Sequence, residues 1–120
     1  MVAANLDLVI EQGTTNIIVV AYKDSAGAAI PLTGYIARMT IRQTIDSSVA
    51  LVTALSTGVS PKLVITTATG LITLTLPATE TDDYAWIGGY YDLEIEAAAP
   101  GSAVTRLLQG KVSVSREVTR

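Results

Sequence analysis

Apolar and polar residues alternate along most of this 120-residue chain, and this two-residue period is what most constrains its fold. A period of two places successive side chains on opposite faces of a β-strand, so that one face can be buried while the other meets solvent. Segment 35–44 shows the pattern best. There Tyr35, Ala37, Met39 and Ile41 fall on one face, and the other face is mostly polar or charged. In the same way we expect the inward residues of segments 71–76 and 90–97 to be Ile72, Leu74, Leu76, Tyr91, Leu93 and Ile95. The pattern predicts a β-structured protein.

Turn-forming residues divide the chain into about eight such segments. We expect strands at 6–11, 16–23, 35–44, 50–55, 63–67, 71–76, 90–97 and 104–114. A short helical crossover capped by Thr79 is expected at 78–84, and a tight turn at 99–102. Turn signals roughly ten residues apart are typical of antiparallel sandwiches. We therefore predict an all-β, antiparallel, immunoglobulin-like β-sandwich with one short helical crossover, forming a single domain over 1–120.

The chain contains neither Cys nor His. Without Cys, disulfides and cysteine-based zinc sites are excluded. Without either residue, the Ser–His and Cys–His arrangements of nucleophilic catalysis cannot be assembled. Glycine patterns that cradle phosphates are also missing from the sequence. We expect a non-enzymatic protein with no catalytic residue, no metal ligand and no cofactor.

The charge balance and hydropathy also exclude several classes of partner. Eight Lys and Arg residues against eleven Asp and Glu give a formal net charge of −3, which argues against a nucleic-acid binder. No apolar run reaches the ~20 residues of a membrane span, and the N-terminus lacks the pattern of a signal peptide. We expect a soluble protein, made in the cytoplasm, that binds neither nucleic acid nor membrane.

Three carboxylates, Asp92, Glu94 and Glu96, lie two residues apart and so share one face of the predicted strand 90–97. They could form a site for a hard cation or pair with basic residues across the sheet. Calcium sites usually draw their oxygens from a tight loop rather than a flat strand, so cross-strand ion pairs are favoured. The candidate basic partners are Arg38, Arg42, Arg106 and Lys111.

The clustered aromatics Tyr84, Trp86 and Tyr90 are candidate residues for binding a ligand or a partner. Aromatic side chains can stack on sugars or anchor an interface. The favoured alternative is structural: Trp86 and the neighbouring Tyr91 would close the end of the sandwich beside Gly88-Gly89. A carbohydrate-binding module that uses Tyr84, Trp86 and Tyr90 remains an alternative function.

Segment 16–23 is apolar on both faces for part of its length, as expected of a central strand or of a strand covered by a partner. The candidate interface consists of apolar residues predicted to face outward: Val9, Ile18, Val20 and Ile36.

Four stretches together resemble a family of phage structural proteins. They are Leu8–Thr15, Leu32–Met39, Tyr91–Ile95 and Thr105–Ser115. Their order is similar to that of the N-terminal domains of upper baseplate proteins in long-tailed phages. The resemblance implies an immunoglobulin-like sandwich that holds receptor-binding parts on the tail. This chain has Arg116 where the family pattern has Pro, and the resemblance transfers no individual functional residue.

These observations lead us to expect a phage virion subunit in the tail, the baseplate or a fibre attachment. It would act by multivalent protein–protein docking, as symmetric copies or a homo-oligomer bound to other virion proteins. Family members continue into a fibre or receptor-binding region. A copy with one domain could instead be a neck or head-decoration subunit.

Overall fold

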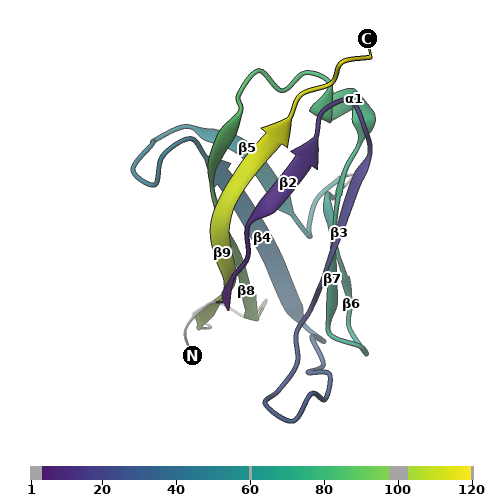
Figure 1. Ribbon diagram of the computed structural model, residues 1–120. Helices are drawn as coiled ribbons and strands as arrows, with labels where there is room; N and C mark the ends of the chain where they lie inside the picture. Colours follow the sequence, from purple (N-terminus) through teal and green to yellow (C-terminus); the bar gives the residue numbers. More distant parts are fainter. Residues whose placement is uncertain (1–3, 60, 98–102, 120) are drawn as a thin grey trace.

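The computed structural model describes residues 4–59, 61–97 and 103–119, which form nine β-strands and one short helix. The elements are β1 (Ala4–Asn5), β2 (Leu8–Glu11), β3 (Asn16–Ala21), β4 (Tyr35–Arg42), β5 (Ala50–Leu55), β6 (Leu63–Thr66), β7 (Leu71–Leu76), α1 (Ala78–Thr81), β8 (Gly88–Ala97) and β9 (Val104–Ser115). The strands pack as two facing sheets (Figure 1), so the predicted all-β sandwich is confirmed. The turn expected at 99–102 lies outside the described residues.

One sheet has six strands in the order β1-β9-β8-β4-β5, with β2 also paired to β9, and the other has the order β3-β7-β6. All pairs are antiparallel except those of β1 and β2, which run parallel to β9. The expectation of a wholly antiparallel sandwich was therefore wrong at this edge. The start of the chain lies beside its last strand, and Leu8 and Ile10 add their side chains to the core.

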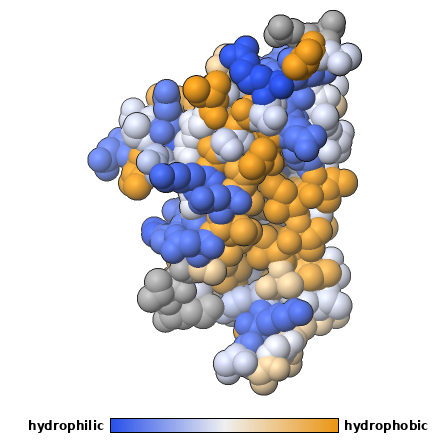
Figure 2. Space-filling view, in the orientation of Figure 1, coloured by the Kyte–Doolittle hydropathy of each residue, from blue (hydrophilic) through white to orange (hydrophobic). Residues whose placement is uncertain are grey.

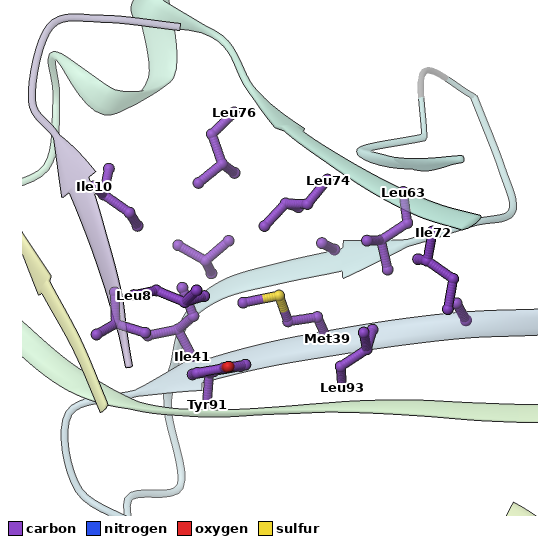
Figure 3. Packing of buried hydrophobic residues seen from close by; sticks show 14 of the residues in the cluster. Leu8, Ile10, Met39, Ile41, Leu63, Ile72, Leu74, Leu76, Tyr91 and Leu93 are labelled. Carbon is purple, nitrogen blue, oxygen red and sulfur yellow. The ribbon is translucent and has the colours of Figure 1, made fainter. Parts of the chain in front are cut away.

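The core is a layer of aliphatic side chains between the sheets (Figure 3). Apart from Tyr35, which begins β4 and is 40% exposed, the residues predicted to share the inward faces of β4, β7 and β8 are buried, which confirms the period-two assignment there. These residues are Ala37, Met39, Ile41, Ile72, Leu74, Leu76, Tyr91, Leu93 and Ile95. Leu32, in the connection before β4, is also fully buried, and its backbone N–H donates to the Thr67 carbonyl at 2.9 Å.

A tyrosine hydroxyl fixes the crossing from β1 to β2. The Tyr91 hydroxyl donates to the Leu6 carbonyl at 2.6 Å, and the Leu6 N–H donates to the Gln109 carbonyl at 3.0 Å. Burial, with a smaller effect from Asp7, raises the pKa of Tyr91 to about 12, so the hydroxyl keeps its proton at neutral pH. The backbone can approach this closely because residue 110 is glycine: a Cβ there would lie 2.3 Å from the Leu6 oxygen.

Helix α1 carries the chain from β7 in one sheet to β8 in the other. Its buried Thr81 hydroxyl donates to the Thr14 carbonyl at 2.8 Å, which ties the helix to the β2–β3 loop. The predicted helix was too long, and its predicted Thr79 cap was wrong. Pro77 holds the cap position without a side-chain bond, and the Ala78 N–H instead donates to the Thr15 hydroxyl at 3.3 Å. A loop distant in sequence thus replaces the local cap.

We predict that Gly110→Ala destabilises the fold by about 1–3 kcal/mol, the usual cost of overpacking, because its Cβ would displace the Leu6 backbone. Chemical denaturation would measure the change. Gly88→Ala is the matched control, since its Cβ would meet its nearest atom, the Val112 oxygen, at 3.4 Å. Equal stability of the two variants would contradict the close approach at residue 110.

Candidate functional site

The outer face of the six-stranded sheet carries ordered rows of polar side chains across β4, β8 and β9. The strand register places three cross-strand rows side by side. They are Arg42–Tyr90–Lys111, Thr40–Asp92–Gln109 and Arg38–Glu94–Arg106. A shift in register at Leu93/Glu94 adds one residue to β9, and this brings Lys111 opposite Tyr90.

The carboxylates of β8 form cross-strand ion pairs with two of the four predicted basic partners, Arg38 and Arg106. Arg38 contacts Glu94 at 3.2 Å and Glu96 at 2.6 Å, and Arg106 lies 3.5 Å from Asp92. Hydrogen bonds to Glu94 and Glu96 raise the pKa of Arg38. Over the described ranges, no group of three or more Asp or Glu residues is placed to hold a metal ion.

A hollow of about 510 Å³ opens on this face, and we call it the Tyr90 hollow. Its lining residues are Asn5, Asp7, Thr40, Arg42, Ile45, Tyr90, Tyr91, Asp92, Arg106, Gln109, Gly110 and Lys111. Arg42 donates to the Ser47 carbonyl at 3.1 Å, and the backbone N–H of Lys111 donates to Asp7 Oδ1 at 3.0 Å. Within residues 4–59, 61–97 and 103–119, neither the Arg42 nor the Lys111 side chain has a carboxylate within 4.0 Å.

The carboxyl group of Asp92, which lines the hollow, has a shifted pKa. Burial raises its pKa above the ordinary value of 3.8, and the nearby Glu94 raises it further. Arg106, Arg42 and Arg38 act in the opposite direction without cancelling the effect. The hollow therefore combines basic groups with a carboxylate that is costly to ionise.

The other sheet has an outer face of a different kind. Ile17 and Val19 on β3 and Val64 on β6 are 63, 57 and 53% exposed. Hydrophobic residues gather on the side of the molecule where β3 lies (Figure 2). This surface offers apolar contact area and no chemistry of its own.

The structure corrects two of the four candidate interface residues. Ile18 and Val20 point inward and pack against the core, because their register partners Leu74 and Ile72 on β7 are themselves buried. The outward positions of β3 belong to Ile17 and Val19, which the sequence analysis did not select. Lys23 could have identified them: it is exposed and shares their place in the alternation.

Val9 and Ile36, the other two candidates, lie on the six-stranded sheet. Val9 on β2 is exposed, and Ile36 on β4 is half-buried on the outer face that carries Arg38. Neither is adjacent in register to Ile17 or Val19, which belong to the other sheet. The four candidates therefore do not form one surface.

The three candidate aromatics do not form one cluster either, because Tyr90 lies apart from the other two. Tyr84 and Trp86 stack with ring centroids 5.0 Å apart, Tyr84 is buried, and Trp86 packs against the core. The Tyr84 hydroxyl donates to Glu80 Oε2, and burial raises the pKa of Tyr84. Tyr90 instead faces the hollow. Trp86 and Tyr91, for which a structural role was favoured, both pack in or against the core. Of the three candidate aromatics, Tyr90 is the one that lines the hollow.

Comparison with known proteins adds evidence on the fold. No family model matches the chain, and no curated protein matches it. Among solved structures it is similar to Tim-1, an immunoglobulin-like protein, with a TM-score of 0.50 and 14% sequence identity over 99% of each chain. At this identity the likeness supports a shared β-sandwich fold alone. No helix in the described ranges is long and apolar enough to cross a membrane.

We predict that Asp92→Asn stabilises the protein near neutral pH. A carboxyl group whose pKa is raised on folding binds its proton more tightly in the folded state, so stability falls as pH rises from 3.8 through the raised value. The variant also loses the ion pair between Asp92 and Arg106, which lie 3.5 Å apart. Because this pair is exposed to solvent, its loss offsets little of the gain in stability.

The test is the difference in unfolding free energy between variant and parent as a function of pH. It should grow through that window and vanish below it. Asp46→Asn, which removes the same charge from an exposed loop, serves as the control. A variant less stable than the parent at neutral pH would contradict the assignment.

Proposed function

We propose that this chain is a non-enzymatic structural subunit of a phage virion, located in the tail or baseplate, that acts by docking to other virion proteins. The observation that carries the proposal is the outer surface of the three-stranded sheet, which we call the aliphatic face. Its outward positions are Ile17, Val19, Ala21, Val64, Thr66, Leu71, Thr73 and Thr75. None of the eight is charged.

An uncharged face of this kind suits contact with protein. Charged residues are depleted at the centres of interfaces, and desolvating an aliphatic face leaves no buried charge uncompensated. Burying an exposed Ile or Val side chain completely contributes about 1.5–3 kcal/mol. Repetition of one modest contact around a symmetry axis adds avidity without new contacts, as a virion component requires.

The edge of the same sheet supports docking as well. Within the described residues β3 pairs only with β7, so its second edge has no strand beside it. Proteins usually protect such an edge with charges, proline or a covering segment, because free backbone groups invite another strand. The β3 sequence, Asn-Ile-Ile-Val-Val-Ala, contains none of these protective residues. A partner strand or a neighbouring copy fits this edge.

We further propose that the sandwich has immunoglobulin variable-type topology. The order β3-β7-β6 matches strands B, E and D, and β9-β8-β4-β5 matches G, F, C and C′. The short helix lies at the E–F corner, between β7 and β8. Such a sandwich presents two large outer faces on a rigid body.

The phage assignment rests on the resemblance described above. Its four stretches fall on β2, β4, β8 and β9 and their adjoining turns, which all belong to the six-stranded sheet. The four stretches would therefore determine the fold. The aliphatic face lies on the other sheet, so its residues would be free to vary with the partner. A neck or head-decoration subunit would use the same mechanism at another location, and finding the subunit in the density of whole particles distinguishes these positions.

The test is incorporation of Ile17→Lys into particles. The outward lysine should leave the monomer folded, because residue 17 is 63% exposed, and should abolish incorporation by placing a charge on the aliphatic face. Val59→Lys, at a 98% exposed loop position, is the matched control and should assemble normally. Circular dichroism verifies folding of both. Normal assembly of Ile17→Lys particles would exclude this face as the interface.

A further inference from the structure

We propose that the Tyr90 hollow is a binding site for an acidic saccharide, a sugar that carries a carboxylate. This inference goes beyond the docking role, since the hollow lies on the six-stranded sheet and the aliphatic face lies on the other. One face can hold the subunit in its assembly while the opposite face meets a ligand. Its volume of about 510 Å³ falls within the range of small-ligand sites, about 300–1,000 Å³.

The basic row of the hollow selects a negative group. Arg42 and Lys111 are the cross-strand neighbours of Tyr90 on either side, so two cations flank one aromatic ring. Neither cation is within ion-pair distance of a carboxylate in the part of the chain described, whereas Arg38 and Arg106 on the same face are both paired. A carboxylate on a ligand would supply the missing counter-ion through charge-assisted hydrogen bonds.

The remaining polar groups favour a sugar over an acidic peptide. Beside the cations lie acceptors for hydroxyl groups: the carboxylates of Asp7 and Asp92 and the amide oxygens of Asn5 and Gln109. The Gln109 oxygen accepts from Arg106 at 3.2 Å and the Asn5 oxygen from the Gln109 amide at 3.5 Å, so each keeps one lone pair for a hydroxyl group. The two carboxylates would repel the repeated negative charges of an acidic peptide. The acidic side chains of such a peptide also have no hydroxyl groups to donate to these acceptors. A saccharide bears one carboxylate and several hydroxyls, which matches the two sets of groups together.

Tyr90 supplies the apolar part of the site. Tyr90 is 38% exposed on a mostly polar face, and Ile45 lines the same hollow. Aromatic rings offer a rigid, amphipathic surface to partly apolar ligands, and the C–H face of a pyranose is such a surface. The row Arg42–Tyr90–Lys111 therefore recognises the two chemical features of an acidic sugar, its carboxylate and its C–H face.

The test is a titration of the ¹⁵N-labelled full chain with galacturonate, glucuronate and N-acetylneuraminate, followed by amide chemical shifts. At least one of these acids should produce saturable shifts around Tyr90 and Lys111. The methyl ester of that acid, which lacks the charge, should bind at least about tenfold more weakly. Absence of saturable shifts with all three acids would overturn the proposal, as would equal affinity for acid and ester.

Variants locate the site. Arg42→Gln and Lys111→Gln should each weaken binding by about tenfold or more, the loss expected for one charge-assisted hydrogen bond. Lys23→Gln removes the same charge from an exposed position after β3, outside the hollow, and should bind as the parent does. Equal weakening by Lys23→Gln would show that net charge alone drives binding. Tighter binding of a short poly-glutamate peptide would show that the ligand is an acidic peptide and not a sugar. Either result overturns the proposal.

The dispersion of the same spectra verifies that each variant is folded. Failure here is distinguishable from failure of the docking proposal, which depends on particles that carry Ile17→Lys.

Discussion

The structure depends on one interaction, the contact of two apolar layers between sheets that no disulfide joins. The chain has no Cys, so the disulfide that links the two sheets of antibody domains has no counterpart here. Ile18 and Val20 from one sheet, and Met39, Tyr91 and Leu93 from the other, meet in this layer. Burial of these side chains must offset the conformational entropy that is lost when the strands become ordered. The stability of the fold therefore depends on which face of each strand points inward.

The same choice determines the two outer surfaces. When Ile18 and Val20 turn inward, Ile17 and Val19 must turn outward, because successive side chains of a strand point to opposite faces. On β8 the inward Tyr91 and Leu93 leave the polar residues of that strand outside. One rule thus produces an aliphatic face on one sheet and a charged face with a hollow on the other. The proposed docking and saccharide sites follow from this asymmetry.

Sequence reasoning succeeded where polar residues marked one face of a strand. In β4 and β8 the charged residues identify the outward side, so the inward sets were correct except for the exposed Tyr35 at the start of β4. In β3 five of six residues are apolar, so nothing within the strand separates the faces, and Ile18 and Val20 were placed outward. The parallel pairing of β2 with β9 joins the two ends of the chain, and no local pattern signals it. The Tyr90 hollow depends on a register shift in β9 that brings Lys111 beside Tyr90, so only three-dimensional pairing reveals it.

The division of β3 between core and surface is the central claim, and a pair of truncations tests it most directly. The measurement is the unfolding free energy of Ile18→Ala and Ile17→Ala by chemical denaturation. The account predicts a loss of about 1–3 kcal/mol for Ile18→Ala, which opens a cavity beside the partly buried core position, and a change within about 0.5 kcal/mol for Ile17→Ala. A larger loss for Ile17→Ala than for Ile18→Ala would show that β3 faces the other way, and would contradict both the core and the aliphatic face described above.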